Sequence, residues 1–269
     1  MSKSPPVVVK LGGSIITRKK EPLRARPKII DRLAREIAQA WQGGHRPVIV
    51  LHGAGSFGHP GAERYGLTRP PRPSSPRSPR GGALTSYHVR TLHQRVLRGL
   101  LDGGLPAVSV PPFPIARNAQ GTLQHFESEP FEQALDQGLV PVSFGDVVLD
   151  GDWGLSILSA DTIARELARR LSAKRVLFVS DVAGVWRRDS VTGKPRVIEH
   201  VTPDVLEGLS RSGAGPDVTG GIRGKVETML EISRGGVPTG LISGLAHGLL
   251  VRAIEGELVY GSWTSDAPA

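Results

Sequence analysis

Two short apolar runs, each followed directly by a glycine-rich turn, constrain the fold of this chain most strongly. The first run, Val7 to Val9, leads into a turn of sequence KLGGS at residues 10–14. The second run, Pro47 to Leu51, leads into HGAGSFGH at residues 52–59. Because glycine has no Cβ, such turns let backbone N–H groups approach an anion closely. Two such turns facing each other would suit an enzyme that passes a phosphoryl group between two bound molecules.

Apolar runs alternate with helical patterns along most of the chain. Between Pro27 and Trp41, for example, Ile30, Leu33 and Ile37 recur at helical spacing, with proline at the start and glycines after the end. The sequence predicts strands at 7–11, 47–51, 106–110, 140–143, 175–180 and 239–242, and a hairpin over 146–158 that turns at 150–152. It predicts helices at 27–41, 84–101, 130–137, 161–171, 221–234 and 246–254. This alternation indicates an α/β fold with a mostly parallel central sheet.

Composition narrows the class of protein. A length of 269 residues fits one large or two small domains, and 39% hydrophobic residues can build a sizeable core. The absence of cysteine excludes disulfides and thiolate metal sites. The sequence contains no apolar run of membrane-spanning length and no visible signal peptide, so we expect a cytoplasmic protein without a membrane partner.

The net charge of +9 raises the possibility of nucleic-acid binding. No nucleic-acid motif is present, and aromatic residues make up only 5% of the chain, so we expect no nucleic-acid partner. Positive potential also speeds the capture of small polyanionic substrates. Part of the charge lies in an Arg- and Pro-rich stretch from Arg69 to Gly82, which we expect to be a mobile loop. This loop is either a solvated insertion or a lid over an anionic substrate.

Two lysines and a histidine are candidates for phosphate chemistry. Lys10 and the amides of Gly12 and Gly13 fit the need for positive charge and backbone donors around a moving phosphoryl group. Lys19 lies close enough in sequence to reach the same centre. The alternative is that it lies in a solvated loop. His59 follows three glycines and precedes an expected helix, so it either contacts a phosphate or serves the helix start.

Three further candidates stand at later turns. Asp161 begins a predicted helix, where it either caps that helix or holds lysines in place. Asp181 follows an apolar strand, at the sheet edge where α/β folds bind ligands. A third glycine-rich stretch at 217–225 ends in Lys225, in the first part of a helix where a cation is locally unfavourable.

Taken together, these turns resemble the amino acid kinase superfamily. The matching signatures are Lys-x-Gly-Gly-Ser at 10–14, His-Gly-x-Gly at 52–55, Ser-Asp-x-x-Gly-Val at 180–185 and Thr-Gly-Gly-x-x-x-Lys at 219–225. Within the superfamily, the stretches at 55–60, 140–146 and 217–221 resemble the isopentenyl phosphate kinase branch.

The resemblance implies a three-layer αβα sandwich formed by a single domain over residues 1–269. About 1–145 would bind the acceptor and about 146–269 would bind ATP. It implies phosphorylation of isopentenyl phosphate to isopentenyl diphosphate with ATP and Mg²⁺, in an alternative mevalonate route, by a homodimer.

The resemblance also implies roles for individual residues. The catalytic residues would be Lys10, Lys19, His59, Asp161 and Lys225. ATP would be bound by Lys10, Gly12, Gly13, Ser14, Gly55, Asp181, Gly220, Gly221 and Lys225. The acceptor would be bound by Ala54, Gly55, Gly58, His59 and Ala160. No protein ligand for the metal is implied, and the helix around Tyr87 to Leu97 would help to build an apolar pocket for the isoprenoid tail.

The chain departs from the family pattern at several positions. Ala54 and Ala160 stand where glycine is common, and their backbone contacts survive only if φ is negative there. His88, Arg90 and His93 are polar where the tail should pack, unless they face solvent. The alternatives are a kinase of the same superfamily that acts on another phosphate or on a fosfomycin-type phosphonate, and a non-catalytic nucleotide-binding protein.

Overall fold

The computed structural model describes residues 4–71, 78–188, 194–209 and 221–264. Within these residues, a central sheet has the strand order β13-β12-β9-β1-β2-β6-β3. All of its strand pairs are parallel except β12 with β13. The predicted α/β fold with a mostly parallel sheet is therefore confirmed. The strands are β1 Val7–Leu11, β2 Val48–His52, β3 Ala107–Ser109, β6 Val140–Phe144, β9 Arg175–Ser180, β12 Thr239–Ser243 and β13 Gly261–Trp263.

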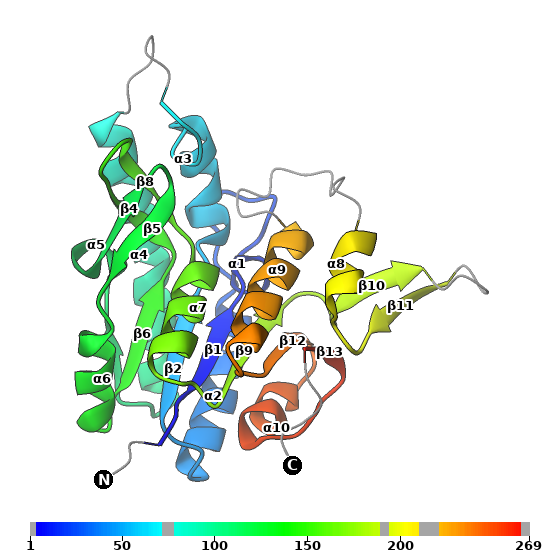
Figure 1. Ribbon diagram of the computed structural model, residues 1–269. Helices are drawn as coiled ribbons and strands as arrows, with labels where there is room; N and C mark the ends of the chain where they lie inside the picture. The colour runs from blue at the N-terminus through cyan, green and yellow to red at the C-terminus, as the bar shows by residue number, and fades with distance from the viewer. Residues whose placement is uncertain (1–3, 72–77, 189–193, 210–220, 265–269) are drawn as a thin grey trace.

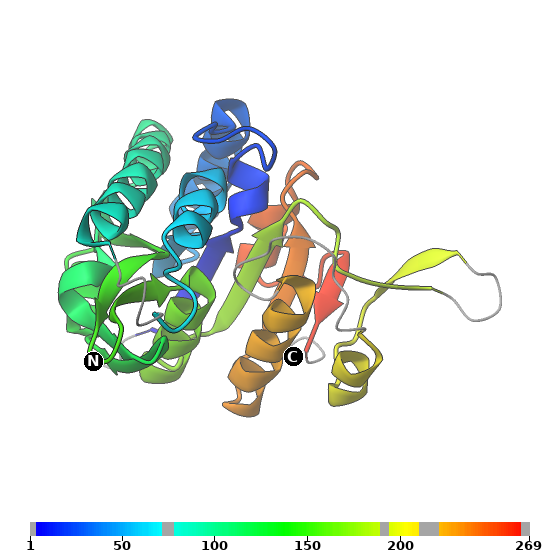
Figure 2. The same ribbon diagram turned by 90° about the horizontal axis from the view of Figure 1, so that it is seen from above.

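Helices cover both faces of this sheet, so the molecule has three layers (Figures 1 and 2). In β1, Val7 and Val9 point into one core and Val8 into the other, because successive side chains of a strand alternate between faces. The first core is closed by α2 Pro27–Gln42, α4 Pro79–Asp102 and α10 Leu249–Glu255. The second is closed by α6 Glu129–Asp136, α7 Ala160–Arg170, α8 Pro203–Gly208 and α9 Gly221–Arg234.

A second, smaller sheet stands beside the first, in the order β5-β4-β7-β8. Its strands are β4 Ala116–Ala119, β5 Thr122–Phe126, β7 Asp146–Asp150 and β8 Gly154–Leu158, and a short helix, α5 Pro112–Ile115, precedes β4. The β7–β8 pair is the predicted hairpin, and Asp150 fixes its turn by accepting backbone N–H bonds from Asp152 and Trp153. Val147 and Ala62 form a small core between this sheet and α3 His59–Arg64. The sheet thus reaches the helix that begins at His59.

Several elements, among them five strands, were not predicted from the sequence. The strands β4 and β5 are short and carry mostly polar residues, so no periodic apolar signal marks them. The hairpin of β10 Val185–Arg188 and β11 Pro195–Ile198 projects from the sandwich (Figures 1 and 2). The edge strand β13 has only three residues.

Two helices begin at least three residues away from their predicted starts. The expected helix at 246–254 begins only at Leu249, because Gly248 takes a left-handed conformation with φ of 73°. The prediction of a loop over Arg69 to Gly82 was wrong for the last four residues, because these form the first turn of α4. The side chain of Ser78 caps this turn and Pro79 occupies its first position, which is a favourable helix start. Residues 72–77 of that stretch lie outside the described residues.

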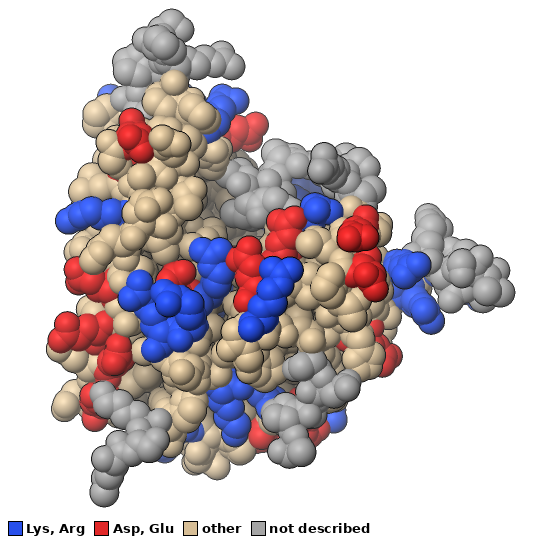
Figure 3. Space-filling view, in the orientation of Figure 1, with Lys and Arg blue, Asp and Glu red and all other residues tan. Residues whose placement is uncertain are grey.

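Surface charges of both signs are mixed on the face that carries α7 and α9 (Figure 3). Arg165 bonds Glu231 at 2.7 Å, and Arg169 and Arg170 both approach Glu166. Basic side chains on this face are therefore largely paired with acidic ones. Among the described helices, none combines the length and apolar character that crossing a membrane would require.

A buried chain of polar groups lies beneath the second glycine-rich turn. His52 Nδ1 lies 3.1 Å from the carbonyl oxygen of Gly53, which can only accept, so Nδ1 carries the proton. His52 Nε2 then accepts from His93 Nδ1 at 3.1 Å, and His93 Nε2 accepts from Ser109 Oγ at 2.7 Å. This arrangement requires both imidazoles to be neutral. Burial lowers the pKa of His52 to about 4 and that of His93 to about 3. His93 therefore faces neither solvent nor a ligand pocket but the interior of the fold.

The histidine pair predicts a loss of stability in mild acid. Below pH 6.5 the unfolded chain binds protons that the folded histidines do not, so the free energy of unfolding falls as pH falls from about 6.5 towards 4. The variant His93→Gln keeps hydrogen-bonding groups at this position but removes one of the two histidines that take up a proton on unfolding. Between pH 7.0 and 5.5, the wild type should lose about 1 kcal/mol more than the variant in urea unfolding. The control is His125→Gln, at an exposed position. Equal losses for the wild type and His93→Gln would contradict the assignment.

Candidate functional site

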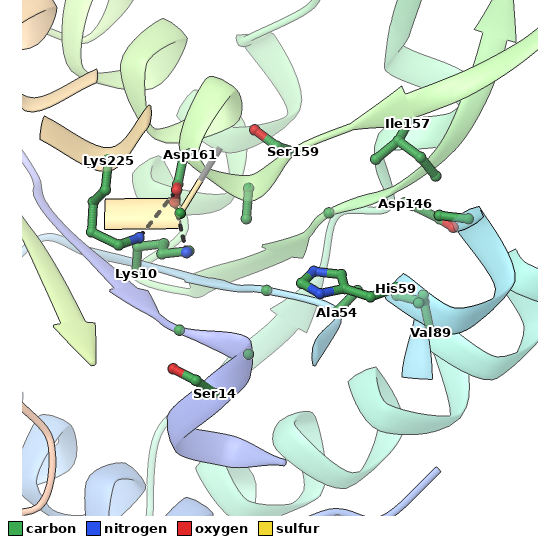
Figure 4. Close-up of a pocket in the computed structure, with 18 of the residues that line it drawn as sticks. Lys10, Ser14, Ala54, His59, Val89, Asp146, Ile157, Ser159, Asp161 and Lys225 are labelled. Atoms are coloured by element: carbon green, nitrogen blue, oxygen red, sulfur yellow. Dashed lines mark hydrogen bonds and ion pairs between the residues drawn. The ribbon is translucent and has the colours of Figure 1, made fainter. Parts of the chain in front are cut away.

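A cleft of about 330 Å³ opens where β1, β2, β8 and β9 end. It lies at the carboxyl edge of the parallel strands, where open α/β sheets bind ligands. Figure 4 shows the side chains that face it. The lining residues that the sequence had singled out are Lys10, Gly12, Gly13, Ser14, Lys19, Ala54, Gly58, His59, Ala160, Asp161, Asp181, Gly221 and Lys225.

A carboxylate bridging two lysines forms the polar end of the cleft (Figure 4). Lys10 Nζ lies 2.6 Å from Asp161 Oδ1, and Lys225 Nζ lies 3.2 Å from Asp161 Oδ2. The three side chains come from β1, α9 and α7 and are 8%, 15% and 13% exposed. Ser159, not Asp161, caps α7, by accepting the N–H of Thr162 at 3.0 Å. Asp161 is therefore available to hold the lysines, which is the second of the two roles that the sequence left open.

The charge states of this cluster follow from its burial. Burial lowers the pKa of Lys10 to about 8, against the opposing effect of Asp161. Burial alone would raise the pKa of Asp161, but the charges of Lys10 and Lys225 hold it well below its usual range. At neutral pH the cluster carries two positive charges and one negative charge. The surplus positive charge suits it to bind an anion.

The two glycine-rich turns pack backbone against backbone. α1 Gly13–Ile16 follows the first turn, and the single-turn helix η1 Gly55–Phe57 lies in the second. A Cβ on Gly13 would lie 2.6 Å from Gly55 Cα, and one on Gly53 would lie 2.8 Å from Gly13 N. Gly55 also has a φ of 49°, which only glycine adopts readily. The predicted facing of the two turns is therefore present, and Gly55 supports Gly13 from behind rather than lining the cleft.

Asp181 lies at the end of β9 beside the first turn. Its Oδ1 accepts hydrogen bonds from Ser14 Oγ at 2.6 Å and from Ser180 Oγ at 3.1 Å. Gly12 N donates to Val179 O at 2.7 Å, which draws the same turn onto the end of β9. Ser14 and Asp181, which are 167 residues apart, thus form one wall of the cleft.

His59 begins α3 and lies between the lysines and the other end of the cleft (Figure 4). That other end is mostly apolar and is formed by Ala62, Val89, Val147, Ile157 and Leu158. The helix around Tyr87 to Leu97, which was expected to help build this pocket, contributes Val89 to it. Tyr87 itself is 66% exposed and does not line the cleft. The cleft thus joins a cationic end to an apolar end, with a histidine between them.

The departures from the family pattern fit this geometry. Ala54 has a φ of −77°, and Ala160 is the first residue of α7, so neither methyl group forces a strained backbone. Lys19 lines the cleft from an exposed position. Gly220 lies outside the described residues. Neither Arg90 nor His93 lines the cleft.

Sequence reasoning missed Asp146 as a lining residue. It is 1% exposed and accepts from Val147 N at 2.7 Å and Ser86 Oγ at 3.0 Å, with Arg90 Nε at 3.4 Å. Burial raises the pKa of Asp146 to about 6. The sequence signals were its place at the start of a hairpin and at the end of the stretch 140–146 that resembles the family branch. Its link to Arg90 of α4, 56 residues earlier, appears only in three dimensions.

One carboxylate of the cleft is suited to contact a metal ion held by a ligand's phosphates. No group of three or more His, Asp or Glu side chains among the described residues is arranged to hold a metal ion. Mg²⁺ in kinases is bound by one or two carboxylates and the substrate phosphates. Asp181 is a carboxylate in the cleft that no lysine neutralises in the contacts described above, so it is the residue best suited to such an ion.

Comparisons with known proteins agree with this geometry. The profile of the amino acid kinase family matches residues 5–243. An isopentenyl phosphate kinase of Methanothermobacter thermautotrophicus is 36% identical over 264 residues, which cover 95% of this chain and 97% of the relative. One of Thermoplasma acidophilum is 31% identical over 226 residues, which cover 84% of this chain and 86% of the relative.

Solved structures give the same result. A crystal structure of an isopentenyl phosphate kinase superposes on this chain with a TM-score of 0.81 at 31% identity. The match covers 96% of this chain and 99% of the other. The product complex of the Thermoplasma acidophilum enzyme gives 0.75 at 26% identity, covering 96% and 99%. The chain therefore belongs to the amino acid kinase family, and within that family it groups with the isopentenyl phosphate kinases.

The bridged lysines predict a strong effect of Asp161→Asn on stability. The variant leaves two nearly buried ammonium groups facing each other without a counter-ion, so it should be about 3 kcal/mol less stable than the wild type. Urea unfolding at pH 7 measures this loss. The double variant Asp161→Asn with Lys225→Met removes one of the unpaired charges and should regain at least half of it. A single variant as stable as the wild type would show that the cluster is too hydrated for the charges to matter.

Proposed function

We propose that this protein transfers the γ-phosphoryl group of ATP to isopentenyl phosphate, giving isopentenyl diphosphate and ADP, in an alternative mevalonate route. The observation that carries the proposal is the cleft itself, which joins a cationic end to a small apolar end. A phosphate ester with a short hydrocarbon tail has the matching polarity. The relatives with this name cover nearly the whole chain, which supports the same acceptor.

The donor phosphates would occupy the cationic end. Gly12, Gly13, Lys10 and Lys225 line this region. Since the Gly12 N–H already donates to Val179 O, the backbone donor here would be the amide of Gly13. An oxygen of the acceptor phosphate forms the new bond to the γ-phosphorus while the bond between that phosphorus and the ADP oxygen breaks. Since the acceptor phosphate is already anionic at neutral pH, the protein's task is to position two anions and offset their charge. Lys10, Lys225 and the more exposed Lys19 would supply that charge.

The acceptor would span the middle of the cleft. His59 would donate a hydrogen bond to its phosphate, and the small residues Ala54, Gly58 and Ala160 would let the phosphate approach the backbone. The tail would then lie against Val89 and Ile157.

Several parts of the proposal rest on the resemblance to the family. These are the Mg²⁺ ion carried by the ATP phosphates, the homodimeric state, the cytoplasmic location, and the role of Gly220 in binding ATP. Gly55, which does not line the cleft, would act by supporting Gly13. The division into an acceptor part at about 1–145 and an ATP part at about 146–269 also remains a prediction. The apolar end of the cleft, where the acceptor's tail would lie, includes Val147 and Ile157. These two residues follow the boundary at about 145 and so belong to the part assigned to ATP.

The test of the function is a phosphotransfer assay with ATP and Mg²⁺. Isopentenyl phosphate, dimethylallyl phosphate, fosfomycin and uridylate are compared by kcat/KM. We expect kcat/KM for isopentenyl phosphate to be at least about 10²-fold higher than for fosfomycin or uridylate. Each of those two acceptors either lacks the short apolar tail or is too large for the apolar end of the cleft. Preference for one of these two would overturn the acceptor but keep the kinase. Nucleotide binding with no turnover of any acceptor would favour the non-catalytic alternative.

His59→Ala should separate the two substrates. Because the side chain would contact only the acceptor phosphate, kcat/KM for isopentenyl phosphate should fall by about 10²-fold or more while the Kd for ATP stays within about twofold. Steady-state kinetics and calorimetry with ATP measure the two quantities. His125→Gln, at an exposed position that does not line the cleft, is the control. A parallel loss of ATP affinity would place His59 at the donor phosphates instead.

A further inference from the structure

Thr17 connects the two glycine-rich turns through a single hydroxyl group. It follows the last residue of α1 and is 1% exposed. Its Oγ1 donates to the carbonyl oxygen of Gly13 at 2.7 Å and accepts from the backbone N–H of Ser56 at 3.1 Å. The hydroxyl therefore uses its donor on the first turn and an acceptor site on the second.

The Thr17 hydroxyl lies in a tightly packed contact between the two turns. A Cβ on Gly55 would lie 2.7 Å from the Gly13 carbonyl oxygen and would also collide with Thr17 Oγ1. The Ser56 N–H is buried, so losing Thr17 Oγ1 would leave it without a partner at a cost comparable to a lost hydrogen bond. With only four residues, α1 is too short to fix its own position, so it depends on such tertiary contacts.

Thr17 also anchors the segment that carries Lys19. It forms an isolated antiparallel bridge with Ala25, and Arg18 N donates to Arg24 O at 2.8 Å. The loop between these pairs contains Lys19, which lines the cleft. Three segments that face the cleft therefore meet at this one residue: the turn at 10–14, the turn at 52–59 and the loop around Lys19.

We propose that Thr17 is a positioning residue that sets the separation of the donor-phosphate and acceptor-phosphate turns during phosphoryl transfer. The inference rests on the proposed function, in which each turn holds one of the two reacting phosphates. Transfer requires the reacting atoms to approach to roughly 3–3.5 Å, and a misplacement of about 1 Å can cost about 10²-fold in rate. Thr17 touches neither phosphate in this arrangement; it acts through Gly13 and Ser56.

The test compares Thr17→Val with Thr17→Ser. Valine keeps the branched shape and loses the hydroxyl, whereas serine keeps the hydroxyl. Thr17→Val should lower kcat by 10- to 100-fold while KM for ATP and Kd for ATP stay within about twofold. Thr17→Ser should retain kcat within about threefold. If Thr17→Val does not fold, Thr17→Ala takes its place in the comparison.

The matched control is Thr91→Val on α4. Thr91 makes the same type of hydrogen bond, from Oγ1 to the carbonyl of the residue four positions earlier, but it is exposed and lies outside the cleft. Its kcat should equal that of the wild type. An equal loss of kcat in Thr17→Ser and Thr17→Val would show that packing, and not the hydroxyl, causes the effect. A wild-type kcat in Thr17→Val would overturn the proposal.

Amide exchange separates this proposal from the proposed function. In the wild type the Ser56 N–H should exchange slowly, and in Thr17→Val it should exchange at least tenfold faster, whichever acceptor the enzyme uses. An inactive wild type with this difference would refute the isopentenyl phosphate assignment but support the link between the turns. Equal exchange in the two proteins would refute the link itself.

Discussion

The arrangement of the cleft depends on the carboxylate of Asp161 between two lysines. Lys10, Asp161 and Lys225 come from a central strand and two helices of one layer, and Asp161 and Lys225 are 64 positions apart in the sequence. Two ammonium groups this close, in a partly dehydrated cleft, would repel each other strongly without the carboxylate. Asp161 removes that repulsion while leaving a net positive charge. The same contact that holds β1 against α7 and α9 therefore also prepares a place for an anion.

A second constraint is the close approach of two backbone turns. Gly13, Gly53 and Gly55 lie where a Cβ would collide with the opposite turn. Side chains are excluded from the contact, so the turns are located by backbone shape and by the hydroxyl of Thr17. This holds the two turns at a fixed separation without placing any bulky group between them. Such preorganisation is what a reaction driven by positioning and electrostatics requires.

Buried polar groups behind the cleft hold its walls in place. The chain from Gly53 through His52 and His93 to Ser109 ties the second turn to α4 and β3. Asp146 ties the start of β7 to α4 through Ser86. Two of the polar residues of α4 that conflicted with an apolar tail pocket, Arg90 and His93, thus have structural partners. The apolar face of the same helix presents Val89 to the cleft.

The sequence by itself determined the layer architecture and most of the polar end of the cleft. Strands such as Arg175–Ser180 and helices such as Gly221–Arg234 were predicted at their observed bounds, because each carries a strong periodic apolar pattern between clear turn residues. The glycine turns and Lys10, His59, Asp161 and Lys225 were recognisable because they stand at strand and helix ends in a family pattern. Only the tertiary structure decided which groups meet. The pairing of Ser14 with Asp181, the role of Thr17 and the apolar wall from β7 and β8 join residues far apart in sequence, and no local periodicity records such contacts.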